Sequence, residues 1–479
     1  MSLSFSSDLK RRTLLSRGYL LTILFLLIAG LCMKWGFDYF NVFDYGNDWW
    51  NTYYNPLHRQ VIRIIFLLFP LIWAVFFLKP ALVGKTPLLR RFIPLVAGVS
   101  CYYWLYSPMC IFWGIALIGV LVVSDYCVRR HPLGRVSWII VALFIYASAQ
   151  FVGVLNGFWT GALASAQNRM MFFALPLFAL LYKPSESEVR LFLMILFRLF
   201  MLFMAFAMVN YFFYTSLLHE SVFSCLTLNK NYFTTLSIPY AGHDILFGFI
   251  GTTFHPTFSA CFFLIIFLTN LWGRTSADEG ATKEELVAYY LLLGGFIIIT
   301  QSRYGMLAFG AMSLCLFAER LLPLFMRCNI TLRRTPLVVA TIALLPIVFF
   351  AFRQKLFFND PARIQMIDHW CDLFPKRWLL GWGTGSESFL IGATHCHNGF
   401  LSMMFTHGVV GLFILLVLVL VWSYEAYRTK NAILTSTGLF VGFLMLVDAP
   451  LNVSYGVSML SILLIFQAGA PRITSPLIK

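Results

Sequence analysis

The chain has 479 residues, of which 60% are hydrophobic and only 11% are charged, and its mean hydropathy is +0.80. A soluble fold of this length does not need so high an apolar fraction, whereas a protein that crosses a membrane many times does. The net charge of +15 would fit a nucleic-acid partner, but lysine and arginine also gather in the cytoplasmic loops of membrane proteins. We therefore expect an all-helical polytopic membrane protein that lies in the lipid bilayer and has no nucleic-acid partner.

Apolar runs long enough to cross a bilayer, about 17 to 25 residues, recur along the whole chain. They predict about 14 transmembrane helices, with a range of roughly 12 to 14 because the runs at 92–124 and 170–182 are short. The runs lie at 19–36, 62–78, 92–106, 108–124, 137–157, 170–182, 190–214, 245–272, 286–301, 304–318, 336–352, 399–423, 432–447 and 457–468. No small-x-small cleavage site follows the first run, so we interpret it as an uncleaved span.

The distribution of charge predicts which side each loop lies on. With the N-terminus inside, most of the 35 lysine and arginine residues fall in cytoplasmic loops, as the positive-inside rule requires. Of the nine histidines only His131 then falls inside, and no Asp or Glu lies at the middle of a predicted span. Both termini are therefore predicted to be cytoplasmic, and the missing mid-span carboxylates count against an ion-coupled transporter.

The chain divides into three parts by its pattern of spans and loops. Residues 1–285 hold N-terminal transmembrane helices, 286–425 include one large outer loop at 353–398, and 426–479 hold C-terminal transmembrane helices. The outer loop carries basic residues against the positive-inside preference, namely Arg353, Lys355, Arg363, Lys376 and Arg377. Either they bind an anionic ligand, since arginine presents a fork of donors suited to phosphate, or they reach lipid headgroups. Arg363 is the strongest ligand candidate because it begins an amphipathic stretch.

A glycine-rich turn, Gly381–Gly385, follows in the same loop. It is either an ordinary turn or a backbone nest for an anion, and it is not a P-loop because no Gly-Lys-Ser/Thr follows. Arg303 and Arg169 lie at the outer ends of two different spans. Each either anchors its span at the headgroups or faces a cavity, and together the two could clamp one pyrophosphate.

The stretch from His395 to Leu420 begins with polar residues and runs without a spacer into a long apolar segment. His397 is a candidate general base because the pKa of an unperturbed histidine lies near neutral pH; alternatively it is a helix-end histidine bonded to a backbone carbonyl. Asn398 is a candidate N-cap for the following span. His255 precedes Pro256, which predicts a break near the outer surface.

His369, Cys371, His395, Cys396 and His397 also invite a zinc interpretation. Their spacing matches no structural zinc module, and adjacent ligands strain tetrahedral geometry, so we expect no metal. A disulfide between Cys371 and Cys396 is favoured over the metal if both thiols face an oxidising compartment.

Three segments resemble the O-antigen ligase and O-antigen polymerase family of bacterial inner-membrane glycosyltransferases. They are TQSRYGML at 300–307, LLGWGTGS at 379–386 with Arg363 upstream, and HNGFLSMMFTHGVVGLFILL at 397–416, where Gly408 and Gly411 fill a Gly-x-x-Gly element. The resemblance covers roughly residues 290–425 in the family's order and on one predicted side of the membrane. The extra histidine at 395 departs from the family pattern.

The resemblance implies transfer of a glycan from an undecaprenyl-diphosphate carrier to an acceptor hydroxyl at the periplasmic face of the bacterial inner membrane. It implies a fold like the metal-independent C-type glycosyltransferases and no cofactor. His397 would act as or assist the base, although the extra His395 leaves the choice of base open. Independently of the resemblance, His395, Asn398 and His255 are candidates for a supporting role. Arg303, Arg363 and Arg169 would hold the donor diphosphate.

Two questions stay open at this point. The acceptor is either another carrier-linked chain, as for a polymerase, or the lipid A core, as for a ligase, and other polysaccharide-assembly proteins are possible partners. The alternative function is a flippase or transporter of a lipid-linked or polar substrate, for which a site reachable from both sides is needed. The candidate polar groups gather on one side, which favours the transferase.

Overall fold

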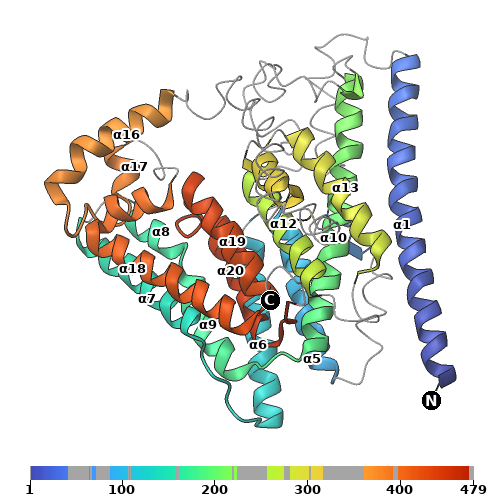
Figure 1. The fold of residues 1–479 in the computed structure, drawn as a ribbon, viewed down its shortest axis with the longest axis horizontal. Coiled ribbons are helices and arrows are strands. Elements are labelled where there is room, and N and C mark those ends of the chain that lie inside the picture. Colours follow the sequence, from blue (N-terminus) through green and yellow to red (C-terminus); the bar gives the residue numbers. More distant parts are fainter. Residues whose placement is uncertain are drawn as a thin grey trace, which may run out of the picture.

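The structure is a computed structural model of the chain. It describes residues 2–40, 87–105, 109–157, 161–217, 221–223, 256–273, 281–300, 304–314, 361–391 and 398–473, with a few single positions or pairs between these ranges. Every regular element in the described ranges is a helix (Figure 1). The α-helices are α1 (Ser2–Tyr39), α5 (Leu88–Trp104), α6 (Met109–Arg129), α7 (Trp138–Leu155), α8 (Ala162–Gln167), α9 (Met170–Leu181), α10 (Glu186–Leu217), α12 (Pro256–Trp272), α13 (Lys283–Thr300), α16 (Pro361–Leu373), α17 (Ser386–Leu390), α18 (Gly399–Thr429), α19 (Ala432–Val447) and α20 (Ser454–Ile465).

The helices form one bundle in which sequence-distant segments pack side by side (Figure 1). Helix α10 packs against α1, α5, α12 and α13, and α18 packs against α7 and α19. Helices α16 and α17 lie at one end of the bundle, which we call the α16 side; the N-terminus lies at the opposite end.

Five described helices are long and apolar enough to cross a membrane: Ser16–Tyr39, Met109–Arg129, Trp138–Leu155, Glu186–Phe212 and Gly399–Thr429. Four shorter apolar helices accompany them, at Thr257–Trp272, Tyr304–Leu314, Ala432–Leu446 and Ser454–Ile465. The structure thus confirms that the described part of the chain is helical, with several helices able to cross a membrane, as expected for a polytopic membrane protein. The predicted span at 336–352 lies outside the described residues, as does most of the one at 62–78.

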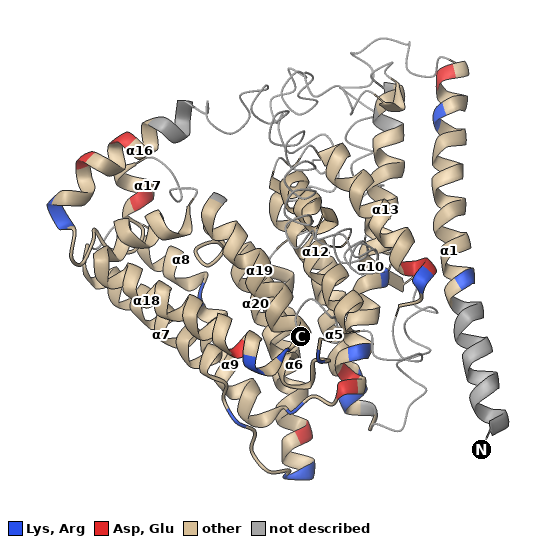
Figure 2. Cartoon of the chain, viewed as in Figure 1, with Lys and Arg blue, Asp and Glu red and all other residues tan. Residues whose placement is uncertain are grey.

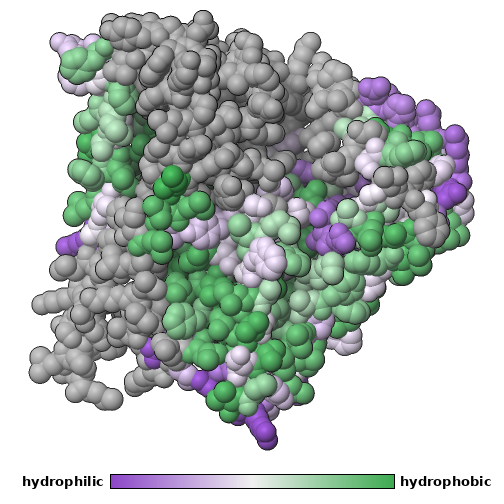
Figure 3. Space-filling model, turned by 180° about the vertical axis from the view of Figure 1, so that it is seen from behind, coloured by the Kyte–Doolittle hydropathy of each residue, from purple (hydrophilic) through white to green (hydrophobic). Residues whose placement is uncertain are grey.

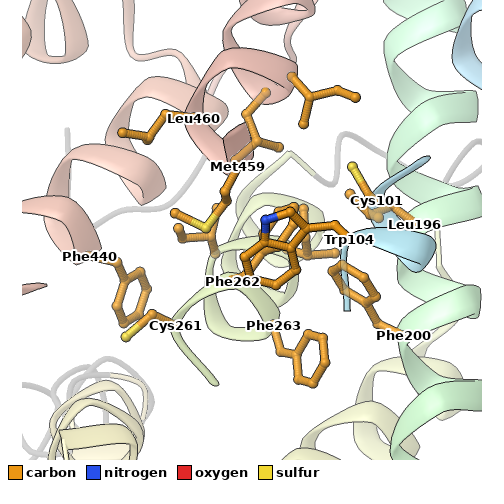
Figure 4. Close-up of a cluster of buried hydrophobic side chains, with 14 of the residues drawn as sticks. Cys101, Trp104, Leu196, Phe200, Cys261, Phe262, Phe263, Phe440, Met459 and Leu460 are labelled. Atoms are coloured by element: carbon orange, nitrogen blue, oxygen red, sulfur yellow. The ribbon is translucent and has the colours of Figure 1, made fainter. Parts of the chain in front are cut away.

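The core forms where α5, α10, α12, α19 and α20 converge (Figure 4). Trp104 stands at its centre, fully enclosed, with its ring 5.3 Å from that of Phe262 in an edge-to-face arrangement. Its indole N–H donates to the Ser458 hydroxyl at 2.9 Å, so the polar atom of this large apolar side chain is satisfied. Helix α10 is apolar on nearly every face, which explains why it is the most deeply buried of the long helices.

The outer surfaces of the helices are apolar as well (Figure 3). Trp113, Phe413 and Leu420 are each more than 65% exposed. Large apolar patches on a water-soluble protein are unfavourable, whereas lipid tails accept them at no cost. These surfaces therefore identify the faces that meet the bilayer.

Charged residues lie mainly towards the helix ends (Figure 2). Arg198, which the sequence places within a span, pairs with Glu285 at 2.9 Å, and both side chains are buried. Arg90 pairs with Glu188 at 3.1 Å and lies 3.7 Å from Asp125. These three residues join α5, α10 and α6 at the end of the bundle opposite to α16. A buried charge is tolerated only with such a partner.

Candidate active site

Helix α18 is broken at Gly408, whose φ of 64° and ψ of −157° lie outside the helical region. The predicted span at 399–423 lies within α18, which is long and apolar enough to cross a membrane, but the sequence did not predict the break. We call Gly399–His407 the short arm and Val409–Thr429 the long arm. The two arms have different surroundings: most of the short arm is buried, whereas the long arm exposes an apolar stripe that includes Val409, Phe413 and Leu420.

The segment from Trp378 to Gly383 fills the break with backbone hydrogen bonds. The amides of Trp382 and Gly383 donate to the carbonyls of Phe405 and Thr406, at 2.9 and 2.8 Å. On the other side of the break, the amides of Val409 and Val410 donate to the carbonyls of Trp378 and Leu379, at 2.9 and 3.3 Å. The inserted segment thus replaces the two i to i+4 bonds that the break removes, and it pairs the carbonyls of Phe405 and Thr406 and the amides of Val409 and Val410.

The glycines of the 381–385 turn permit this close approach. Gly381 has a φ of 68°, and a Cβ built there would lie 2.5 Å from the amide nitrogens of His407 and Gly408. Only glycine fits a positive φ in such contact with another backbone. The amides of Trp382 and Gly383 are committed to the carbonyls of α18, and that of Thr384 donates to Gly153. The turn is therefore not the anion-binding nest considered above.

His407 closes the joint from inside the bundle. Its Nε2 lies 3.2 Å from the carbonyl oxygen of Ala149 on α7 and 3.3 Å from the Thr384 hydroxyl, and its Nδ1 lies 2.7 Å from the Thr406 hydroxyl. A carbonyl oxygen can only accept, so the contact with Ala149 places a proton on Nε2. The Thr406 hydroxyl beside Nδ1 itself donates to the Ser402 carbonyl at 2.8 Å. His407 thus ties α7, the glycine turn and α18 together.

A chain of buried polar groups lies beside the short arm. The Tyr146 hydroxyl donates to Asn452 Oδ1 at 2.6 Å, Asn452 Nδ2 donates to the Ser402 hydroxyl, and Ser402 donates to Glu387 Oε2 at 2.9 Å. Each of these side chains is at most 8% exposed. We call these four residues, with Arg169, the Glu387 network. It joins α7, α17, α18 and the loop before α20.

Arg169 lies at the start of α9 and is only 2% exposed. Its Nη1 donates to the carbonyl and the hydroxyl of Ser165, and the guanidinium interacts electrostatically with Glu387 and Tyr146. Its Nε has no hydrogen-bond partner among the described residues. A buried N–H of a charged group that lacks a protein acceptor is a place where an anionic oxygen would be stabilised.

Asn398 is the N-cap of α18, as predicted. Its side-chain oxygen accepts from the amides of Phe400 and Leu401, both at 3.0 Å, and its Nδ2 donates to the carbonyl of Leu446 at the end of α19. The cap fixes where the short arm begins and attaches that point to α19. Because His397 directly precedes Asn398 in the sequence, the cap also fixes where the chain enters the short arm.

The remaining predicted site residues are only partly covered by the structure. Arg363 lies in the first turn of α16, a helix whose exposed residues include His369 and Cys371. Arg303, His255, His395 and His397 lie outside the described residues. Ser302, just before Arg303, accepts from the amide of Gly305 and lies 3.4 Å from the Thr257 hydroxyl of α12. The sequence neighbours of Arg303 and His255 are therefore in contact.

Cys371 is exposed. Its predicted disulfide partner, Cys396, lies outside the described residues, so the pairing stays a prediction.

Sequence reasoning missed Glu387 and Ser402. One signal was available: Glu387 is the only carboxylate between Asp372 and Glu425, directly after the glycine turn. Ser402 gave none, because a serine in an apolar helix is common and its partners come from three other segments.

Part of the chain matches the model of a known protein family. Residues 288–416 match the family model described as O-antigen ligase, and no curated protein matches the chain. The matched region contains the glycine turn, Glu387, Asn398 and the break in α18, and it supports an O-antigen ligase- or polymerase-type function in surface polysaccharide assembly. Residues 288–416 therefore form a domain of the O-antigen ligase and polymerase family, as the three sequence motifs indicated.

Proposed function

We propose that this protein is a glycosyltransferase that moves a glycan from undecaprenyl diphosphate to an acceptor hydroxyl in surface polysaccharide assembly. The observation that carries this proposal is the O-antigen ligase match at residues 288–416, which spans Arg303, Arg363 and His397. The Asn398 cap supports it, because it fixes the start of the short arm and attaches this point, next to His397 in the sequence, to the end of α19.

In this reaction the acceptor oxygen attacks the anomeric carbon of the donor sugar. The bond between that carbon and the diphosphate oxygen breaks, and the proton of the acceptor hydroxyl passes to His397 as general base. The configuration at the anomeric carbon is inverted, and no covalent enzyme intermediate forms. His395 and His255 support the base, and Asn398 positions it through the cap.

Arg303, Arg363 and Arg169 hold the donor diphosphate and stabilise the charge that develops on it as it leaves. A diphosphate leaving group needs charge stabilisation more than protonation, and arginines supply that charge without a metal. The Nε of buried Arg169 has no hydrogen-bond partner in the described part of the chain, which supports its role, since a diphosphate oxygen would complete its hydrogen bonding.

We further propose the membrane arrangement expected from the sequence. The chain crosses the bacterial inner membrane about 14 times in a C-type glycosyltransferase fold, with both termini in the cytoplasm and the α16 side in the periplasm. Residues 286–425 would contribute the reaction centre, and 1–285 and 426–479 the surrounding helices. The buried charge pairs of Arg90 and Arg198 at the other end of the bundle are consistent with a cytoplasmic concentration of basic residues.

The first test uses cells that lack the native gene and are complemented with wild type, His397→Ala or Arg303→Ala, with surface polysaccharide separated on a gel. We expect both variants to lose activity. Loss of long chains with accumulation of short carrier-linked repeats would identify a polymerase, and retention of long carrier-linked chains without transfer to lipid A would identify a ligase. His369→Ala, at an exposed residue of the same loop, serves as the matched control and should behave as wild type. If His397→Ala and Arg303→Ala are expressed and fully active, the assignment is wrong.

A second test separates transfer from transport. Protein in detergent micelles, with no membrane to separate two compartments, is given a labelled carrier-linked glycan and an acceptor, with and without EDTA. A transferase forms a longer or lipid A-linked product and releases undecaprenyl diphosphate in both cases. A flippase would form neither product.

A further inference from the structure

Three consecutive large apolar side chains are exposed directly before the glycine turn. Trp378, Leu379 and Leu380 are 55%, 48% and 59% exposed. Lys376 and Arg377 precede them and are exposed too, so positive charge lies where the chain turns after α16 (Figure 2). We call residues 376–380 the basic-apolar segment. Apolar side chains of this size, exposed side by side, indicate a surface that meets something other than water.

The backbone of this segment is fixed to two helices. The carbonyls of Trp378 and Leu379 accept from the first two amides of the long arm, at 2.9 and 3.3 Å. The carbonyl of Leu380 accepts from Nδ2 of Asn156, the residue directly after α7, at 3.1 Å. The segment is therefore attached to α18 and α7 through backbone groups, and its exposed side chains are not needed for that attachment.

The same two helices expose apolar side chains next to these attachment points. Val409, Val410 and Phe413 are exposed on the long arm, and Leu155, which directly precedes Asn156, is exposed on α7. Both α7 and α18 are long and apolar enough to cross a membrane, and lipid tails accept such side chains. The apolar part of the basic-apolar segment is thus continuous with helix faces that meet the bilayer, and lipid is the occupant that fits it.

The two basic residues indicate which lipid the surface favours. The Arg377 guanidinium lies over the Trp382 ring, 4.9 Å from its centroid, and its Nη1 donates to the carbonyl of Asn156 at 3.4 Å. Neither Lys376 nor Arg377 has a carboxylate partner in the part of the chain that the structure describes. Tryptophan lies at headgroup level in membrane proteins, and basic side chains beside it reach phosphates. Two uncompensated positive charges favour a headgroup with a net negative charge.

We propose that the basic-apolar segment binds anionic phospholipid in the leaflet on the α16 side. Trp378, Leu379 and Leu380 insert among the acyl chains, and Lys376 and Arg377 bind the headgroup phosphate. Because the segment is bonded to the first amides of the long arm, this contact places the break in α18 near the headgroups of that leaflet. The inference goes beyond the proposed function and does not depend on which glycan is transferred.

The first experiment measures how brominated phosphatidylcholine quenches tryptophan fluorescence in vesicles that contain the full-length protein, with unbrominated lipid as the reference. Trp378→Phe should lower the quenched fraction of the emission, because it removes a tryptophan that contacts lipid. Trp113→Phe, at an exposed position on membrane-spanning α6, is the positive control and should do the same. If Trp378→Phe yields no folded protein, Leu380→Trp places a reporter in the same segment, and the quenched fraction should then rise.

The second experiment tests the preference for negative charge. Brominated phosphatidylglycerol and brominated phosphatidylcholine are compared at the same low mole fraction in phosphatidylcholine vesicles, and the Trp378 signal is the difference between each protein and its Trp378→Phe counterpart. A basic residue near the surface attracts anionic lipid about fivefold, so phosphatidylglycerol should quench Trp378 more strongly at low salt and less so at high salt. Lys376→Gln should reduce this preference and Lys376→Arg should keep it. Arg428→Gln, at an exposed basic residue in the last turn of α18, is the matched control and should leave it unchanged.

Three results would each overturn the proposal. A wild-type quenched fraction in Trp378→Phe, or no rise in Leu380→Trp, would show that the segment does not enter the bilayer. Equal quenching of Trp378 by the two brominated lipids would exclude recognition of anionic headgroups. An undiminished preference in Lys376→Gln, or an equal decrease in Arg428→Gln, would show that the segment is not its source. Neither experiment contains a glycan donor or acceptor, so these outcomes are independent of the transferase activity.

Discussion

Replacing Gly408 by alanine should disrupt the joint between the glycine turn and α18. The φ of 64° and ψ of −157° belong to a region that is essentially restricted to glycine, and a side chain there costs about 1–3 kcal/mol. The added Cβ would also meet the backbone carbonyl of Leu379 and lie 2.6 Å from the oxygen of Trp378. These two oxygens accept from the amides of Val409 and Val410, so moving them away loses two hydrogen bonds, each worth about 0.5–1.5 kcal/mol.

The combined cost for Gly408→Ala is about 2–6 kcal/mol, a large share of the stability of a typical folded protein. Gly442→Ala is the matched control, because Gly442 lies in the neighbouring helix α19 and a Cβ there meets nothing within 4 Å. Alanine is the better helix former by about 1 kcal/mol, so this control should be as stable as wild type or more so. Thermal unfolding in detergent, followed by tryptophan fluorescence, measures both variants. A Gly408→Ala protein that unfolds at the wild-type temperature would refute the structure of this joint.

Three more predictions concern single contacts. Asn398→Ala removes the acceptor for two amides at the start of α18 and should destabilise the protein by about 0.5–2 kcal/mol, whereas Asn398→Asp should retain most of the cap; unfolding of the two variants is compared. His407→Ala removes side-chain contacts to α7 and the glycine turn and should cost about 1–3 kcal/mol, measured in the same way; wild-type stability would contradict its bridging role. Arg198→Ala leaves buried Glu285 without its partner and should cost about 3–5 kcal/mol, while Arg198→Met combined with Glu285→Leu should recover most of it. If the double variant is no more stable than Arg198→Ala, the pair is not the source of the loss.

The helices could be predicted from the sequence because their signals are local. Apolar runs of sufficient length mark α6, α7, α10 and α18, and an asparagine before such a run predicted the N-cap at Asn398. Each of these signals depends on residues close together in the chain. The same holds for the placement of charged residues towards the helix ends.

The break in α18 could not be predicted in this way. Gly408 alone is compatible with a continuous helix, and it becomes a break only because the segment 378–383 supplies replacement hydrogen bonds from about 25 residues upstream. For the same reason, the glycine turn was interpreted as a turn or an anion nest. Its amides are taken by carbonyls of another helix, which no local pattern reveals.

The Glu387 network shows the same limit for side chains. Tyr146, Asn452 and Ser402 are far apart in the sequence and ordinary in their local context, and only packing brings them to Glu387. His407 is similar: the sequence shows a histidine within an apolar run, but its partners come from α7 and the glycine turn.

In the proposed function, the short arm determines how far His397 lies from the lipid-facing long arm. Its nine residues rise about 13 Å, from His407 beside α7 to the Asn398 cap beside the end of α19. The long arm exposes an apolar stripe, whereas most of the short arm is buried. A carrier whose isoprenoid tail stays beside the long arm must therefore extend its diphosphate and first sugar along the short arm to reach His397. The length of one helical segment would thus select for carriers with a polar head long enough to reach the base.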